Sequence, residues 1–98
     1  MAEVRWTLQA AVDIESICDF IAKDSPHYAR LFAVKVFEAI EHLIKFLQSG
    51  RVVPEINNTA VRELILGSYR IVYRYKKDLV ELLTIHHSSR PLNSTRLL

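Results

Sequence analysis

The 98-residue sequence is poor in the residues that mark several protein classes. It has one cysteine, two glycines and three prolines, and its formal net charge is only +2. A single cysteine excludes an internal disulfide, and the scarcity of glycine and proline argues against a linker-like or low-complexity chain. That cysteine, Cys18, lies on the apolar side of a helical pattern, which favours a small buried hydrophobe over a nucleophile or a ligand.

The sequence also lacks a long apolar run and a signal pattern. Its apolar stretches are too short and too often interrupted by charge to cross a bilayer, and no basic, apolar and small-residue series opens the chain. We therefore expect a cytoplasmic protein with no membrane partner. Half of the residues are nevertheless hydrophobic. Since this length suits one compact core, a single domain over residues 1–98 is predicted.

Charge is distributed unevenly along the chain. Residues 1–50 carry five Lys/Arg against seven Asp/Glu, whereas residues 51–98 carry eight against four. The first half is therefore net −2 and the second half net +4. Coulomb attraction would direct an anionic partner, either RNA or an acidic protein, to the second half.

Hydrophobic periodicity predicts an α+β fold in the order β-α-α-β-β-β. Residues 3–6 alternate like a strand, and Thr7 is a suitable N-cap for the helix that follows. A second helix should begin at Pro26 with Ser25 as its N-cap, and its apolar stripe continues to Leu47. The two helices should form a hairpin packed on one face of a small, mainly antiparallel sheet.

Three strands are expected after a loop over residues 51–59, and they comprise residues 60–66, 69–75 and 79–87. The first two flank Gly67 and Ser68, which suit a two-residue type II′ turn with glycine at its first central position. Lys77 and Asp78 would form the next turn. Residues 88–98 show no periodicity and are predicted to be an irregular tail.

The two turns imply a register. They pair Leu66 with Tyr69 and Arg74 with Glu81, and opposed residues of paired strands share a face. The face away from the helices would then collect these side chains: Glu63, Ile65, Arg70, Val72, Arg74, Glu81, Leu83, Ile85 and His87. We predict that this face is cationic and open to a partner.

Six segments in a fixed order carry a resemblance to a known family. They are Trp6 with residues 10–14 (Ala-Ala-Val-Asp-Ile), 21–26 (Ile-Ala-Lys-Asp-Ser-Pro), 50–55 (Gly-Arg-Val-Val-Pro-Glu), 62–64 (Arg-Glu-Leu), 67–74 (Gly-Ser-Tyr-Arg-Ile-Val-Tyr-Arg) and 86–90. Each segment alone is weak, but their order and spacing together are specific. On these residues the chain resembles the RelE/ParE superfamily of toxins, nearest to its ParE-like branch.

The resemblance implies the toxin of a type II toxin–antitoxin, or plasmid-stabilisation, module, bound in a hetero-oligomer by a cognate antitoxin encoded beside it. It implies no cofactor and no metal. Toxins similar to ParE poison DNA gyrase, whereas toxins similar to RelE or YoeB cut messenger RNA on the ribosome. We expect gyrase as the target, with Arg51, Arg62, Arg74 and Arg90 contacting the target or the antitoxin.

The ribonuclease alternative assigns roles to three residues. Metal-free RNA cleavage needs a base, a cation for the phosphate and an acid for the leaving oxygen. By similarity to the YoeB-like pattern, Glu55 would be the base, Arg70 the phosphate clamp and His87 the acid. However, Ser88 replaces the tyrosine expected after the histidine, and the lysines that RelE-like enzymes place before the first hairpin are absent. These departures favour a non-enzymatic inhibitor, and a toxin fold that has lost its toxicity is a third hypothesis.

The same residues also have purely structural interpretations. Glu55 would orient the loop or pair with Arg62, and Arg70 and Arg74 would form surface ion pairs with Glu63 and Glu81. His86 and His87 are neighbours on a strand, so one of them should face the core. Tyr69, Tyr73 and Tyr75 are spaced like a base-stacking ladder, but packing against the helices is the favoured interpretation. No ligand spacing predicts a zinc site.

Overall fold

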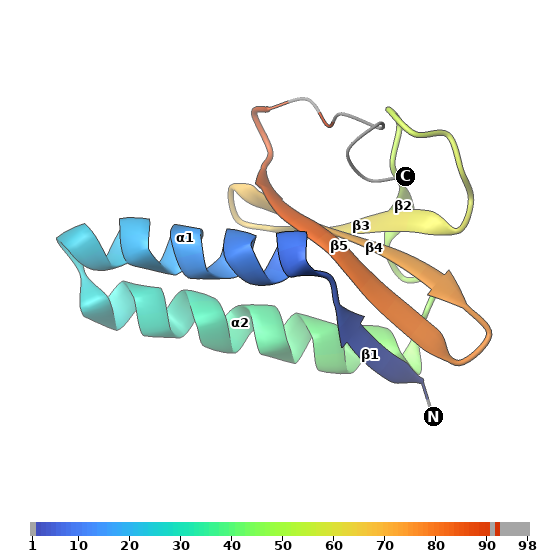
Figure 1. The fold of residues 1–98 in the computed structure, drawn as a ribbon, viewed down its shortest axis with the longest axis horizontal. Coiled ribbons are helices and arrows are strands. Elements are labelled where there is room, and N and C mark those ends of the chain that lie inside the picture. The colour runs from blue at the N-terminus through green and yellow to red at the C-terminus, as the bar shows by residue number, and fades with distance from the viewer. Residues whose placement is uncertain (1, 91, 93–98) are drawn as a thin grey trace.

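The computed structural model describes residues 2–90 and 92, which form two helices and a five-stranded sheet (Figure 1). The elements are β1 (Glu3–Trp6), α1 (Leu8–Asp24), α2 (Pro26–Lys45), β2 (Arg51–Val52), β3 (Val61–Leu66), β4 (Tyr69–Lys76) and β5 (Leu79–His87). The strand order is β1-β5-β4-β3-β2, with β1 parallel to β5 and the other neighbours antiparallel. The predicted α+β order is confirmed, with β2 as an addition inside the expected loop.

Both helices begin at the predicted caps. The Thr7 hydroxyl accepts a hydrogen bond from the Ala10 N–H at 3.2 Å and donates one to the Leu82 carbonyl at 2.7 Å. One side chain therefore both starts α1 and fastens it to β5. Ser25 accepts from the Tyr28 N–H at 3.2 Å, and Pro26 is the first residue of α2.

The two helices lie side by side and cover one face of the sheet (Figure 1). The core between these layers consists of apolar and aromatic side chains: Ala10, Val36, Ile40 and Leu43 of the helices, with Ile71, Tyr73, Val80, Leu82 and Ile85 of the strands. Burial of this stripe holds the hairpin in place, because short helices gain most of their stability from packing. Neither helix within the described part of the chain combines the length and apolar character that a membrane span requires.

The predicted turns fix the register as expected. Leu66 pairs with Tyr69 across the first turn, and Arg74 pairs with Glu81 beyond the second. Gly67 has a φ of +59°, in the left-handed region that a type II′ turn needs at this position.

A β-bulge interrupts the pairing of β4 with β5. Tyr73 pairs with Leu82, but the preceding Val72 pairs with Thr84, so that Leu83 has no partner on β4. One extra residue in a strand reverses the alternation of side chains beyond it.

The bulge changes the face of the last residues of β5. Ile85 joins the helix-covered core, and the ring of His87 contacts the edge of the Tyr69 ring, with 5.3 Å between centroids. His86, not His87, is the residue that pairs with Arg70. The prediction that Ile85 and His87 share a face with Arg70 is therefore wrong, because hydrophobic alternation contains no signal for this bulge.

The other side of the sheet, called the second face below, is not open. It carries a smaller apolar cluster made of Val53, Val61, Val72, Leu83 and Leu92. The segment between β2 and β3 supplies Val53, and the C-terminal segment supplies Leu92. The expectation of an open cationic face is thus wrong. Of the predicted irregular tail, residues 88–90 and 92 are described; the rest lies outside the described residues.

Candidate functional site

The second face is organised around the guanidinium of Arg70. Its Nη1 and Nη2 donate to Glu55 Oε2 and Oε1 at 2.8 and 2.9 Å, and its Nε donates to Glu63 Oε1. The other oxygen of Glu63 accepts from Arg51 Nε at 2.5 Å. The side chain of Arg70 is only 6% exposed and that of Glu63 is fully buried. One cation is therefore held between two carboxylates in a largely desolvated place.

Short strand β2 makes this arrangement possible. Arg51 pairs with Glu63 in the register of β2 and β3, which brings its guanidinium to the buried carboxylate. The loop that follows β2 carries Glu55 to Arg70. In the sequence, Pro54 predicted irregular structure for this segment. The strand pairing of Arg51 and Val52 just before it was therefore not predicted.

The ion pair shifts both ionisation equilibria. The hydrogen bonds from Arg70 lower the pKa of Glu55 from 4.5 to about 2, and the Leu92 N–H contributes in the same direction. The pKa of Arg70 is raised further, chiefly by its hydrogen bonds to Glu55. A carboxylate with so low a pKa is a weak proton acceptor near neutral pH, since base strength follows pKa.

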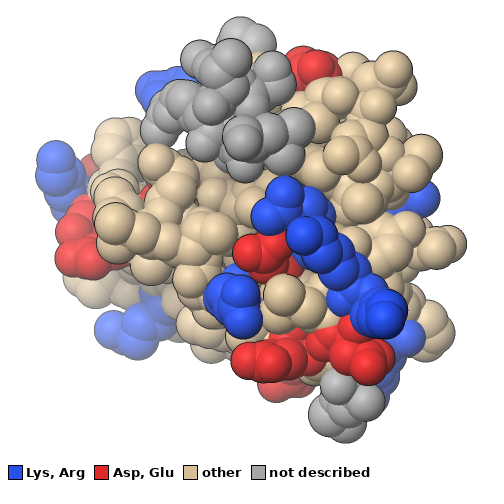
Figure 2. All heavy atoms as spheres, turned by 45° about the vertical axis from the view of Figure 1, so that its right-hand side comes forward, with Lys and Arg blue, Asp and Glu red and all other residues tan. Residues whose placement is uncertain are grey.

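The remaining predicted arginines differ in their surroundings. Arg74 donates to Glu81 at 2.8 and 3.1 Å, as predicted, and lowers the pKa of that carboxyl. Arg62 does not pair with Glu55 but donates to the backbone carbonyls of Gly50 and Thr59, at 3.0 and 3.1 Å. On the face shown in Figure 2, acidic and basic side chains lie next to one another rather than in separate patches.

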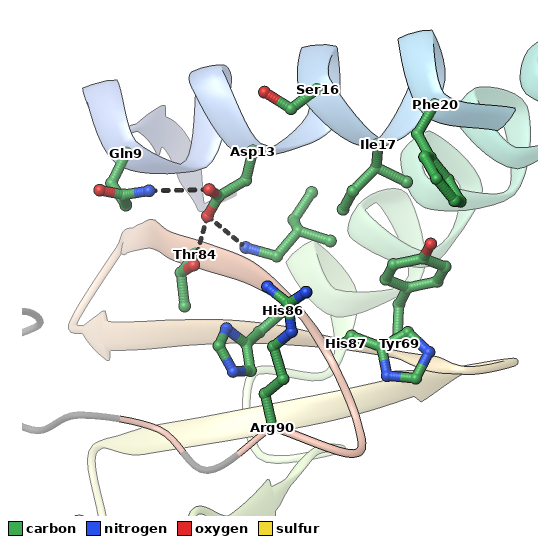
Figure 3. A pocket seen from close by; sticks show the side chains of 11 residues that line it. Gln9, Asp13, Ser16, Ile17, Phe20, Tyr69, Thr84, His86, His87 and Arg90 are labelled. Carbon is green, nitrogen blue, oxygen red and sulfur yellow. Dashed lines mark hydrogen bonds between the residues drawn. The ribbon is translucent and has the colours of Figure 1, made fainter. Parts of the chain in front are cut away.

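The third residue of the ribonuclease hypothesis, His87, lies on the other side of the sheet from Arg70. His87 Nδ1 is 2.7 Å from Ser89 Oγ, and its ring lies against Tyr69. It lines a cavity of about 560 Å³ between α1 and the end of β5, to which Arg90 also contributes (Figure 3). The structure thus brings Glu55 and Arg70 together, but places His87 on the helix side of the sheet.

One residue of this cavity escaped the sequence analysis. Asp13 of α1 accepts from the Thr84 hydroxyl and, at 3.1 Å, from the Ile85 N–H (Figure 3). Gln9 donates to its other oxygen at 2.7 Å. Because β1 pairs only as far as Leu82, Asp13 supplies an acceptor to the edge of β5 just beyond. In the sequence, Asp13 stands out only as part of the segment 10–14 that carries the family resemblance.

The tyrosines pack rather than form a stacking surface. Tyr73 is fully buried, donates to the Leu47 carbonyl at 2.9 Å and accepts from the Gly50 N–H at 3.1 Å. Burial raises the pKa of its hydroxyl. A Cβ at Gly50 would lie 2.6 Å from the Glu63 carbonyl, so only glycine fits there. Tyr69 lies against Phe32, with ring centroids 5.1 Å apart.

The surroundings of Cys18 and the grouping of possible metal ligands can also be described. Cys18 is half-buried rather than buried; its Sγ lies 3.9 Å from the Ala29 carbonyl, and burial raises the pKa of the thiol. Among residues 2–90 and 92, no three His, Cys, Asp or Glu side chains are grouped as a metal site would require.

The helical hairpin on a five-stranded sheet of this order is a toxin fold of the RelE/ParE type. The chain belongs to the family of ParE toxins of type II toxin–antitoxin systems (parDE), whose family model matches residues 4–92.

Individual relatives agree with this family. The chain is 37% identical over 87 residues to Y4kP of Sinorhizobium fredii, whose name classes it as a toxin, covering 87% of this chain and 86% of the relative. It is 31% identical over 91 residues to toxin RelE2 of Caulobacter vibrioides, covering 92% and 99%. A chain from the chromosomal ParDE system of P. aeruginosa has the same fold, with a TM-score of 0.71 at 24% identity and coverage of 89% and 96%.

Proposed function

We propose that this toxin stops growth by binding DNA gyrase in the cytoplasm, without cleaving RNA, and that a cognate antitoxin neutralises it. The observation that carries the proposal is the state of Arg70. Its side chain is 6% exposed, and its guanidinium is bound by two carboxylates. A phosphate clamp needs donors that face the substrate, and here the donors face Glu55 and Glu63.

The other two roles of a ribonuclease are also poorly supported. Glu55, with a pKa of about 2, is a weak base, and His87 contacts Tyr69 and Ser89 rather than the Arg70 pair. Base, cation and acid would have to meet around one phosphate for the chemistry to proceed. A toxin that acts through its surface has no such requirement.

The exposed arginines are the better candidates for partner contacts. The side chain of Arg51 is 61% exposed although its Nε binds Glu63, and Arg90 is exposed at the rim of the α1–β5 cavity. Arg62 and Arg74 are half-buried and hold the loop and β5. We therefore assign antitoxin or target contact first to Arg51 and Arg90, whose charge suits an acidic segment.

Induction of the toxin without its antitoxin tests the proposal. We expect incorporation of labelled thymidine to fall before that of labelled methionine, with an SOS response and cleaved DNA complexes. Purified toxin should inhibit supercoiling by gyrase, and co-expressed antitoxin should restore growth. Thymidine incorporation that outlasts protein synthesis would contradict the proposal, and unchanged growth would favour a fold without toxicity.

The ribonuclease alternative keeps one supporting observation, the 31% identity to a relative named RelE2. It predicts prompt arrest of translation with codon-periodic cuts in messenger RNA. Those cuts should disappear in Arg70→Ala but persist in Arg74→Ala, the matched variant on the same strand. Absence of cuts in the unaltered toxin would exclude this alternative.

A further inference from the structure

The outer side of α2 carries a row of four exposed side chains, called the α2 row below: Arg30, Val34, Phe37 and Glu41. At about 100° per residue, this row lies about 120° around the helix from the stripe that α2 buries in the core. Val34 and Phe37 are 51% and 52% exposed, although the Phe37 ring lies 5.7 Å from that of Trp6. Packing of the hairpin therefore leaves two apolar side chains of the row half in solvent.

The spacing of the α2 row is that of a coiled-coil seam. Its members follow one another at intervals of four, three and four residues. A period of 3.5 residues keeps side chains on one line along a helix, so that they can contact a second helix over several turns. Two apolar residues occupy the middle of this line, and a cation and an anion occupy its ends. A charged end at each side of an apolar centre is a pattern suited to a helical partner.

The charged ends of the α2 row have no ion-pair partner in the part of the chain that the structure describes. The ion pairs there join Arg51, Arg70 and Arg74 to carboxylates, and neither Arg30 nor Glu41 takes part in them. Both charges are thus free to meet a partner. Such charges select a surface that presents the opposite sign at the same spacing.

A second copy of α2 presents that surface. The midpoint between Val34 and Phe37 is also the midpoint between Arg30 and Glu41. A twofold axis through this point, perpendicular to the helix, runs two copies antiparallel. It sets Val34 of one copy against Phe37 of the other and Arg30 against Glu41, and each contact occurs twice. A parallel pair would instead oppose like charges at both ends.

We propose that the α2 row is a self-association surface through which two copies of this toxin pair with their α2 helices antiparallel. Two contacts of Val34 with Phe37 form the centre, and two ion pairs of Arg30 with Glu41 close the ends. The contact is small, so the dimer is weak and reversible rather than obligate. The helices cover one face of the sheet and Arg51 binds Glu63 on the other, so pairing leaves Arg51 accessible. This inference goes beyond the proposed function and holds whichever target the toxin has.

Sedimentation equilibrium of the purified full-length toxin, in a concentration series up to about 1 mM, measures the pairing. Arg30→Glu opposes two carboxylates at each end of the seam and should weaken self-association about tenfold. Glu41→Arg opposes two guanidinium groups and should weaken it equally. Both substitutions together restore opposite charges and should restore the association. Lys35→Glu is the matched control, because it makes the same change of charge at an exposed position of α2 outside the row.

A mixture of the two single variants is the sharpest test. Neither variant pairs well with itself, but in a mixed pair each carboxylate of Arg30→Glu faces a guanidinium of Glu41→Arg. The mixture should associate about tenfold more tightly than either variant alone, and high salt should reduce this gain. Val34→Asp, which places a charge in the apolar centre, should abolish pairing while circular dichroism stays unchanged, since Val34 is exposed.

Three results would overturn the proposal. They are a toxin that stays monomeric throughout the series, an association that Arg30→Glu weakens no more than Lys35→Glu does, and a mixture that associates no more tightly than its components. The substituted positions are exposed, and circular dichroism of each variant checks that a lost association is not a lost fold. Inhibition of gyrase is measured separately, so failure of the pairing and failure of the proposed function are distinguishable.

Discussion

On the helix-covered face, the sheet buries a continuous set of apolar and aromatic side chains, whereas the second face buries Arg70 and Glu63 beside a smaller apolar cluster. The first arrangement is stabilised roughly in proportion to buried apolar area. The second depends on matched charges, because a buried ion that loses its partner is strongly destabilising. The two faces should therefore respond differently to substitutions of similar size.

The largest effect is expected where a buried charge is left alone. Glu63→Ala removes the fully buried carboxylate that binds both Arg70 and Arg51. We expect the free energy of unfolding to fall by about 4 kcal/mol, because Arg70 keeps only one partner in a desolvated place. Urea denaturation followed by circular dichroism measures this change.

Glu81→Ala is the matched control on the same face. Glu81 also pairs with an arginine, but both side chains of that pair are partly exposed. Its loss should cost less than about 1 kcal/mol, as for other solvated ion pairs. Equal effects of the two substitutions would mean that Glu55 alone suffices for Arg70, and that the buried ion pair is no more sensitive than the partly exposed one.

A core substitution probes the helix-covered face. Leu43 of α2 is fully buried in the main apolar cluster, so Leu43→Ala should lower the free energy of unfolding by about 3 kcal/mol. Leu8→Ala, at an exposed position, should change it by less than about 0.5 kcal/mol. If Leu43→Ala proved as mild as Leu8→Ala, the hairpin would not be held by burial.

A smaller effect is expected at the join between helix and sheet. Asp13→Ala deprives the Thr84 hydroxyl and the Ile85 N–H of their acceptor. The expected loss is about 2 kcal/mol, the usual cost of leaving buried donors unsatisfied. Hydrogen exchange at Ile85 should quicken, while Asp19→Ala, at an exposed position of α1, should not alter it. Unchanged exchange in Asp13→Ala would remove Asp13 from this role.

Local rules of the sequence predicted most of the fold. Thr7 and Ser25 cap the helices as expected, and Gly67 forms the turn that fixes the pairing of β3 with β4. These features depend on residues within a few positions of one another, which is why they can be recognised without coordinates. The pair of Arg74 with Glu81 followed from the same short-range register.

The predictions that were wrong concern contacts between distant parts of the chain. The bulge at Leu83 has no local signature, and it moved His87 to the other side of the sheet. The structural interpretation paired Glu55 with Arg62, whereas Glu55 binds Arg70, with which the ribonuclease hypothesis had grouped it. Such pairings are decided by which backbone segments meet, and hydrophobic alternation alone does not encode that.

Acid provides the mildest test of the second face. The folded-state pKa of Glu55 is about 2, below the ordinary 4.5. Its contribution to stability is therefore complete above about pH 4.5 and is lost as the pH falls toward 2. After screening at a side chain that is 30% exposed, we expect about 1 kcal/mol.

Urea midpoints at pH 6, 4.5 and 3 measure this loss. In Glu55→Gln the urea midpoint should fall less between pH 4.5 and pH 3, because the amide does not titrate. Glu81→Gln should remove a smaller part, since Arg74 lowers the pKa of that carboxyl from a more solvated position. If the urea midpoint of Glu55→Gln fell with acid as steeply as that of the unaltered protein, Arg70 would draw its stabilisation from Glu63 alone. The second face would then owe its acid sensitivity to other carboxylates.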